Sequence, residues 1–168
     1  MEALVEARSV TKRFSQGFFS GQKNTALNDV SIRIEPGETV GLVGESGSGK
    51  STLALSIARL LNVDSGHIFF DGDEITHLNT SKMRPLRKEL QFVFQDPYSS
   101  LNPRMTVKGI ISEGIRLHRG LSNTNEIEDA IANALTTVGL DKDSMKKHPR
   151  EFSGGQRQRI AIARALAV

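Results

Sequence analysis

The residues best suited to chemistry lie at positions 44–51, which read Gly-Glu-Ser-Gly-Ser-Gly-Lys-Ser. This segment fits the pattern G-x-x-x-x-G-K-[ST]. Its glycines permit positive φ, so successive N–H groups can cradle phosphate oxygens at the positive end of a helix dipole. Lys50 could then reach the β- and γ-phosphates, and the Ser51 hydroxyl could ligate a Mg²⁺ ion that bridges them. The segment therefore predicts a nucleoside-triphosphate site.

The plain alternative for this segment is a flexible glycine turn before a capped helix. We favour nucleotide binding, because the flanking sequence has the strand and helix that the motif requires. Residues 39–43 form an apolar run without polar alternation, which predicts a parallel strand covered on both faces. From Lys50 onward, apolar residues recur at helical spacing, which predicts a helix. The turn at residues 62–66 is expected to end this helix. Its apolar stripe consists of Leu53, Ile57, Leu60 and Leu61.

A second candidate anion site lies near the end of the sequence. Ser153 and Gln156 form a capping-box pattern at the start of a helical stretch. The free N–H groups of Gly154 and Gly155 would open this helix, and the missing side chains would let a phosphate approach closely. The plain alternative is a well-capped helix without a ligand, and the capping box alone would be sufficient for that. The presence of two phosphate-type motifs in one chain favours a second site of nucleotide contact.

The remaining sequence predicts a mixed α/β chain. Residues 32–34 and 67–70 read as strands that end at turn signals, and residues 90–94 read as another buried strand. Between Pro97 and Pro149 the pattern is helical only, which we interpret as an inserted helical subdomain. One apolar stripe consists of Val107, Ile110, Ile111 and Ile115, and the second, stopped by Gly139, of Ile127, Ile131, Ala134, Leu135 and Val138.

Composition excludes several function classes. The 168 residues carry 22 Lys plus Arg against 19 Asp plus Glu, a net charge of +3, and contain no Cys. The lack of Cys excludes disulfides, thiolate zinc sites and Cys nucleophiles. The basic runs lack interleaved aromatics, so we expect no nucleic-acid partner. The sequence shows no secretory signal and no apolar run near the ~18 residues of a membrane span, so we expect a cytoplasmic chain.

The second motif also points to a family. Phe152–Arg159, followed by Ile-Ala-Ile-Ala-Arg-Ala-Leu, resembles the signature sequence of ABC ATPases, with Phe where Leu is common. The resemblance covers essentially the whole chain. It implies an α/β fold: a P-loop NTPase core of the RecA-like type, an N-terminal antiparallel β portion, an inserted α-helical subdomain and an incomplete sheet. The implied division is 1–95 for the β and P-loop core, 96–152 for the helical subdomain and 153–168 for the signature helix.

The resemblance implies roles for further residues. Gln95 matches the Q-loop glutamine, which would approach Mg²⁺ and the attacking water. Without the other motifs, we would interpret Gln95 as a loop residue that caps a strand end. Phe14 matches the aromatic that stacks on adenine, with a buried core Phe as the alternative. The implied catalytic residues are Lys50 and Gln95, and the implied metal ligands are Ser51 and Gln95. The implied ATP-binding residues are Phe14, Gly44, Glu45, Ser46, Gly47, Ser48, Gly49, Lys50, Ser51, Thr52, Gln95, Ser153, Gly154, Gly155 and Gln156.

Residues 94–106, Phe-Gln-Asp-Pro-Tyr-Ser-Ser-Leu-Asn-Pro-Arg-Met-Thr, resemble the Q-loop region of importers for dipeptides, oligopeptides and, in some members, nickel or glutathione. This resemblance implies a subunit that uses ATP and Mg²⁺ and pairs head to tail with a second ABC ATPase subunit. The pair would bind two transmembrane permease subunits at the cytoplasmic face of the membrane, peripherally. An extracytoplasmic binding protein would deliver the substrate, which would never meet this chain.

A complete family member continues past the signature helix into the Walker B strand with its Mg²⁺-binding Asp, the catalytic Glu, the D-loop and the switch His. This sequence stops at Val168, before all four. We therefore expect a chain truncated before Walker B, with little ATP hydrolysis by these residues alone, and an unpaired edge beside the P-loop strand. Two function classes stay open: the N-terminal part of an ATPase subunit, and an inert fragment that binds nucleotide or the partner ATPase.

Overall fold

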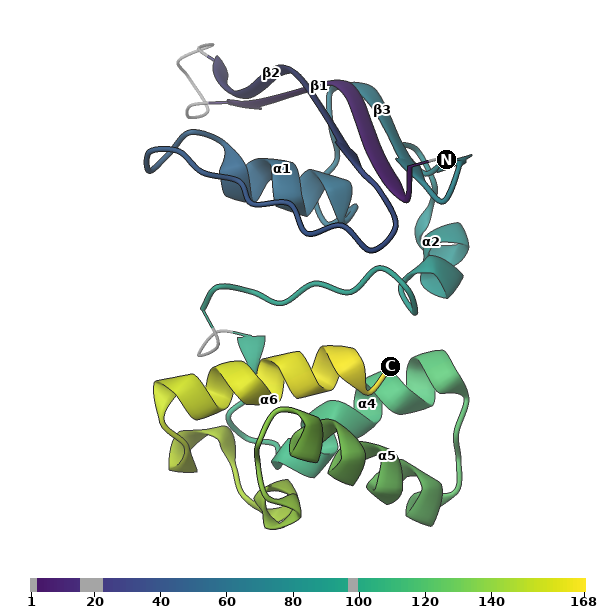
Figure 1. Cartoon of the computed structure of the whole chain (residues 1–168), viewed down its shortest axis with the longest axis vertical. Helices are drawn as coiled ribbons and strands as arrows, with labels where there is room; N and C mark the ends of the chain where they lie inside the picture. Colours follow the sequence, from purple (N-terminus) through teal and green to yellow (C-terminus); the bar gives the residue numbers. More distant parts are fainter. Residues whose placement is uncertain (1–2, 16–22, 97–99) are drawn as a thin grey trace. The chain divides into compact units, whose positions relative to one another are not determined.

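The computed structural model describes residues 3–15, 23–96 and 100–168. They form two compact units, Met1–Met83 and Arg84–Val168 (Figure 1). The N-terminal unit is built on a β-sheet and the C-terminal unit on helices, and each is described by itself. The three-part division expected from the sequence, with boundaries at 95/96 and 152/153, stays a prediction.

Four antiparallel strands form the sheet of the N-terminal unit, in the order β2-β1-β3-β4. Val5 of β1 lies opposite Ile34 on one side and opposite Phe70 on the other. The predicted strands at 32–34 and 67–70 are confirmed as parts of β2 and β3. The strands are β1 (Val5–Ser15), β2 (Lys23–Ile34), β3 (Ser65–Phe70) and β4 (Asp73–Glu74).

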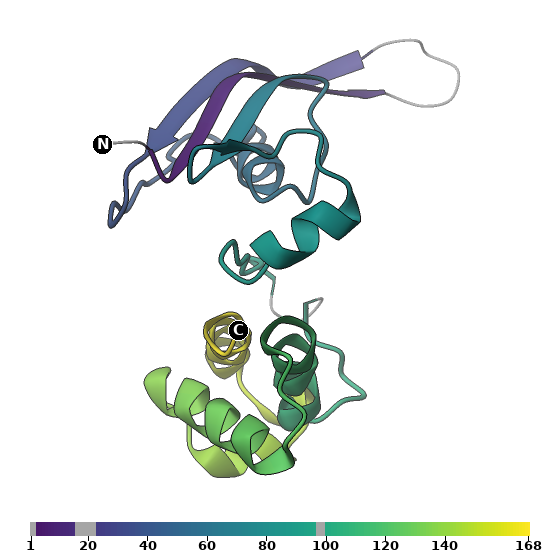
Figure 2. The ribbon, with the colours of Figure 1, turned by 90° about the vertical axis from the view of Figure 1, so that its right-hand side faces the viewer.

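Helix α1 (Lys50–Ile57) lies along one face of this sheet, as both views of the ribbon show (Figures 1 and 2). Val5 and Ala7 alternate with more exposed residues along β1, so one face of the strand supplies the buried surface. Helix α2 (Thr80–Leu86) follows β4. The buried hydrophobic residues of this unit are Ala3, Val5, Ala7, Val10, Leu27, Leu53, Ala58, Ile68, Phe70, Ile75 and Met83.

Two predicted strands are wrong. Residues 39–43 and 90–94 form neither helix nor strand. Val43 is 98% exposed and Phe94 is 41% exposed. A strand satisfies its N–H and C=O groups by pairing with a neighbour, and no strand of the described residues pairs with either segment. An apolar run indicates a preference for burial, but the strand forms only where a partner strand is present.

Helix α1 is shorter than predicted. It ends at Ile57, and Arg59 adopts the left-handed φ of 52°. The N–H of Arg59 donates to the Ser56 carbonyl and the N–H of Leu60 to the Leu55 carbonyl, each at 2.9 Å, which closes the helix in a Schellman arrangement. Leu60, expected on the buried stripe, is therefore 47% exposed.

Asp64 gives the N-terminal unit a pH-dependent link to β1. Its carboxylate accepts the N–H of Arg13 at 2.6 Å and the Nζ of Lys12 at 3.3 Å. The hydrogen bond from the Arg13 N–H is the largest influence on the pKa of Asp64, and it lowers that pKa. The hydrogen bond and the charge of Lys12 lower it further. The folded-state pKa thus lies below the unfolded value of about 4. The stabilisation is complete above that unfolded value and is lost as the pH falls through the folded pKa.

We therefore expect Asp64→Asn to destabilise the chain at neutral pH and to have no effect in acid. The loss at pH 7 should be less than about 1 kcal/mol, because the carboxylate is partly exposed to screening water. Melting temperatures of both proteins between pH 7 and pH 3 test this. Asp73→Asn, which removes an exposed carboxylate of the same sheet, is the matched control. A difference that stays constant down to pH 3 would show that charge is not the cause.

The C-terminal unit packs three long helices around one core, together with two short 3₁₀ helices (Figure 2). Both predicted apolar stripes are confirmed: every residue named for them is buried except Val138, which is partly buried. The second stripe ends where predicted, at Gly139 with φ 71°. The elements are α4 (Val107–Arg119), α5 (Thr124–Thr137), η1 (Lys142–Lys146), η2 (Pro149–Glu151) and α6 (Gly154–Leu166).

Candidate functional site

The predicted phosphate-binding loop lies directly before α1 in the N-terminal unit. Gly47 and Gly49 have φ of 83° and 92°, in the left-handed region that favours glycine. Gly49 is the N-cap of α1, and a Cβ at this position would lie 2.4 Å from the carbonyl oxygen of Ala26 on β2. This close approach holds the start of α1 against the sheet. Residues 44–48 are exposed, so an anion can reach the helix N-terminus from solvent.

Lys50, in the first turn of α1, folds back over this loop. Its Nζ donates to the carbonyls of Gly44 at 2.8 Å and Glu45 at 2.6 Å, and to Ser48 Oγ at 3.1 Å. The three donors of the ammonium group thus hold the loop closed. The first turn of α1 carries no acidic residue. An anion at this helix N-terminus would meet the Lys50 charge and the positive helix end together.

A divalent cation beside the loop would rely on few protein oxygens. Ser51 is exposed and Thr52 half-buried on the first turn of α1. Among the residues that the structure describes, no three His, Cys, Asp or Glu side chains gather as a metal-binding set. Mg²⁺ commonly keeps several waters and binds through few protein groups plus substrate phosphates. The Ser51 hydroxyl fits such a site only together with a bound nucleotide.

The second candidate site has the predicted cap. The N–H of Gln156 donates to Ser153 Oγ at 3.3 Å, and the N–H of Ser153 donates to Gln156 Oε1 at 2.9 Å. The capping box is thus confirmed at the start of α6. A Cβ at Gly154 or Gly155 would find no atom within 4 Å. The first turn of α6 therefore presents bare backbone to open space, as close approach of a phosphate requires.

Sequence reasoning missed the residue that supports this turn. Arg157 is only 8% exposed although it lies one turn into α6. Its Nε donates to the Pro149 carbonyl at 2.7 Å and its Nη2 to the Arg150 carbonyl at 3.4 Å. Phe152, between these partners and Ser153, is also buried. The guanidinium therefore fixes the chain that enters α6, an interaction that no local pattern of apolar residues indicates.

Phe14 and Gln95 are both accessible. Phe14, near the end of β1, is 41% exposed, and the Nζ of Lys12 lies 5.6 Å from its ring centroid. This exposure contradicts a buried core Phe and leaves ring surface for stacking. Gln95 is exposed in an irregular segment. Phe14 and the phosphate-binding loop belong to the N-terminal unit, and Gln95 and Ser153 to the C-terminal unit. Their roles toward a nucleotide stay predictions.

Comparison with known proteins decides the family. The family described as ABC transporter matches residues 27–168, which is most of the chain. The chain belongs to the ABC transporter family. The family resemblance drawn from the two glycine motifs is thereby confirmed.

Two ABC relatives show the extent of the similarity. The chain is 47% identical over 165 residues to the oligopeptide transport ATP-binding protein OppF of Streptococcus mutans, covering 98% of this chain and 53% of the relative. It is 46% identical over 168 residues to the dipeptide transport ATP-binding protein DppF of Lactococcus lactis, with the same two coverages. The chain therefore spans about half the length of these curated relatives.

A solved ABC cassette confirms the predicted fold class. The dimeric structure of a bacterial ABC transporter cassette matches with a TM-score of 0.87 at 32% identity, covering 97% of this chain and 69% of that one. The chain is thus an α/β ABC cassette, whose described strands form the four-stranded antiparallel sheet. The individual strands expected at 39–43 and 90–94 remain corrections to that prediction.

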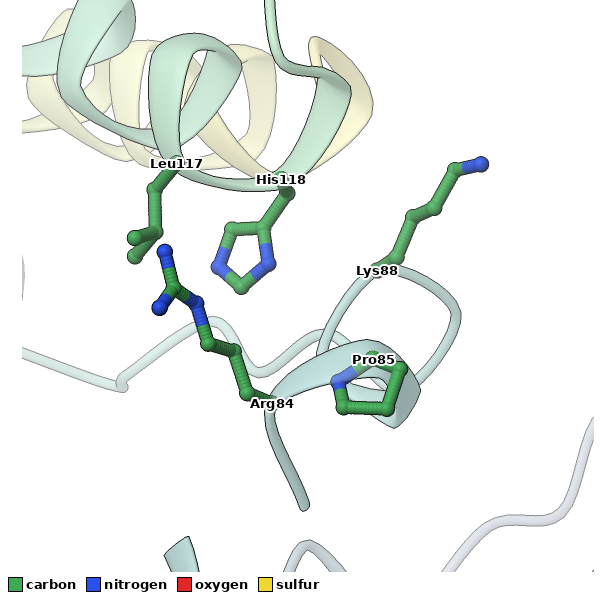
Figure 3. A pocket seen from close by; sticks show the side chains of 5 residues that line it. All are labelled: Arg84, Pro85, Lys88, Leu117 and His118. Carbon is green, nitrogen blue, oxygen red and sulfur yellow. The ribbon is translucent and has the colours of Figure 1, made fainter. Parts of the chain in front are cut away.

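A cavity of about 320 Å³ in the C-terminal unit of this ABC chain has a lining that does not overlap the predicted ATP-binding residues. Figure 3 shows the Arg84 side chain extending toward Leu117 and His118 at the end of α4. None of the predicted site residues lines it. Arg84 and Lys88 make the cavity basic, but neither belongs to the candidate nucleotide contacts. The lining residues are Arg84, Pro85, Lys88, Leu117 and His118.

Proposed function

We propose that this chain is the nucleotide-binding part of an ATP-binding subunit of an ABC importer for peptides, or for related solutes such as nickel or glutathione. One observation carries the proposal: Lys50 closes a loop of left-handed glycines against the first turn of α1. The names of the two relatives, for oligopeptide and dipeptide transport, support the substrate class. They also favour an ATPase subunit over an inert binding fragment.

In this proposal the loop binds the triphosphate of ATP. The N–H groups of residues 44–49 and the N-terminus of α1 hold the phosphate oxygens, and Lys50 exchanges its loop carbonyls for the β- and γ-phosphates. The Ser51 hydroxyl would hold Mg²⁺, which would supply charge stabilisation for the transferred phosphoryl group. Phe14 would stack on the adenine. Gln95 would orient the attacking water.

The open turn at Ser153 contacts a second nucleotide in this proposal. The N–H groups of Gly154 and Gly155 would meet the γ-phosphate bound to the loop of a second ABC ATPase subunit, so each active site would draw on two chains. No helix in the described part of the chain is long and apolar enough to cross a bilayer. The names of the transport relatives support the further proposal that the subunit binds two permease subunits at the cytoplasmic face of the membrane, served by an extracytoplasmic binding protein.

Deleting the gene for this chain tests the proposal in the cell. We expect uptake of radiolabelled di- and oligopeptides to fall, and the wild-type gene to restore it. A gene carrying Lys50→Ala should not restore uptake, whereas Lys82→Ala, which removes an exposed lysine of α2, should do so. Unchanged peptide uptake, with loss of nickel or glutathione uptake, would contradict the peptide substrate and keep the ABC importer. Unchanged uptake of all three would contradict the importer itself.

A further inference from the structure

Lys12 and Phe14 lie on the same side of β1. They are two residues apart, and side chains two apart along a strand point to one face of the sheet. The Nζ of Lys12 lies over the Phe14 ring, 5.6 Å from its centroid, which is within the range of a cation–π interaction. The ammonium group therefore covers one face of the ring, while the 41% exposure of Phe14 leaves ring surface open to solvent.

Asp64 holds the Lys12 ammonium in this position. Its Oδ1 accepts a hydrogen bond from the Lys12 Nζ at 3.3 Å, and its Oδ2 accepts one from the backbone N–H of Arg13 at 2.6 Å. The N–H of Asp64 donates in turn to the Thr11 carbonyl at 2.9 Å. Asp64 is thus tied to the strand residues on both sides of Lys12, and the Lys12 side chain is only 14% exposed. The long side chain is ordered before any ligand arrives, so binding does not have to order it.

The Lys12 side chain points to the side of the sheet on which the phosphate-binding loop lies. Lys12 is paired with Leu27 of β2, and directly opposite residues of two strands point to the same face. Leu27 is buried, and its Cδ2 atom lies 3.2 Å from where a Cβ at Gly49 would stand. Gly49 is the N-cap of α1, at the end of the loop. The Lys12–Phe14 pair and the loop therefore share one face of the N-terminal sheet.

We propose that Lys12 is a positioning residue for the nucleotide base: its ammonium, held by Asp64, fixes the Phe14 ring from one face, so that the base stacks on the other. This inference rests on the proposed function, which assigns Phe14 to the adenine. A ring that is free to change rotamer would have to be ordered when the base binds, and this ordering would weaken binding. Lys12 acts through the ring and does not touch the nucleotide, so its effect is limited to ligands that carry a base.

The order of the ring is measured first, without nucleotide. The chain contains no Trp, so Phe14→Trp places a single indole at this position, and indole is the best aromatic partner for a cation. Time-resolved fluorescence anisotropy of this parent should show a narrow range of local motion. Lys12→Met should widen that range, and Lys12→Arg, which keeps a cation, should restore it. Arg13→Met removes the neighbouring exposed charge and keeps the N–H bond to Asp64, so it should match the parent.

Titration of the same variants separates an effect on the base from an effect on the phosphates. We expect Lys12→Met to weaken the binding of MgATP about 2- to 5-fold, on the scale of an exposed cation–π interaction. Magnesium tripolyphosphate carries three linked phosphates and no base, so its affinity should be the same in the parent and in Lys12→Met. Arg13→Met should bind both ligands as the parent does.

Two results overturn the positioning role. One is unchanged indole motion in Lys12→Met, and the other is an equal loss of affinity for MgATP and tripolyphosphate, since Lys12 would then act on the phosphates or on the fold. If Lys12→Met does not fold, Asp64→Asn takes its place. The amide has one oxygen and cannot accept from both Lys12 and Arg13 as the two carboxylate oxygens do, so indole motion as narrow as in the parent would have the same meaning.

The two measurements also distinguish this inference from the function on which it rests. The motion of the indole is recorded without nucleotide, so it decides whether Lys12 and Asp64 fix the ring even where no ligand binds. Absence of binding of both MgATP and tripolyphosphate in the parent would contradict the proposed function alone.

Discussion

Lys50→Ala is expected to weaken the binding of MgATP to this chain by about 10- to 100-fold, the equivalent of one hydrogen bond to a charged group. The structure supports this effect because the Lys50 ammonium already lies over the loop, on the carbonyls of Gly44 and Glu45. A phosphate at the start of α1 would replace these neutral acceptors by charged ones. Alanine at this position removes the side-chain cation that lies over the loop.

Isothermal titration with MgATP measures this change. Lys82→Ala has the same change of charge on α2 of the same unit and should bind as the wild type does. The fold should survive in Lys50→Ala, because the freed loop carbonyls belong to exposed residues and can bond water. Equal affinities of the two variants would show that the loop does not bind the triphosphate through Lys50, and the proposed function would lose its main support.

The sequence predicted well those features that depend on neighbours along the chain. The capping box of Ser153 and Gln156 needs residues three apart, and the structure contains both of its hydrogen bonds. The left-handed turns at Gly47 and Gly139 likewise follow from glycine at a motif position and at a helix end. Helical stripes such as that of α5 succeed for the same reason, since a period of 3.6 residues is local. Most of the candidate site is made from such local units.

Features that depend on distant partners were predicted poorly. Residues 39–43 have the composition of a buried strand, yet Val43 is 98% exposed, because strand formation needs a second backbone that the described residues do not place there. Arg157 and Arg164 hold carbonyls of Pro149 and Ser100, and an arginine in a helix gives no sign of which distant carbonyl it will meet. Strand pairing and long-range hydrogen bonds join residues that are far apart in the sequence. No local periodicity of the sequence therefore indicates them.

The contact between Gly49 and β2 combines both kinds of feature, and it leads to the largest expected change in stability. The motif indicates a glycine at this position for its φ, which is 92°. Only the structure shows that a Cβ would also lie 2.4 Å from the Ala26 carbonyl oxygen. That oxygen belongs to the backbone of a paired strand, so it cannot move away without disturbing the sheet. Gly49→Ala should therefore incur backbone strain and a steric clash together.

Gly47 provides the matched control, because its φ of 83° is similar and a Cβ there would find no atom within 4 Å. We expect Gly47→Ala to cost about 1–2 kcal/mol for the left-handed backbone alone. Gly49→Ala should cost that amount and roughly 1–3 kcal/mol more for overpacking. Native-state hydrogen exchange of amides in β1 measures the free energy of opening of the N-terminal unit in each variant. Equal losses at the two positions would mean that α1 moves away from β2 freely, and the sheet would then not be what holds the phosphate-binding loop in place.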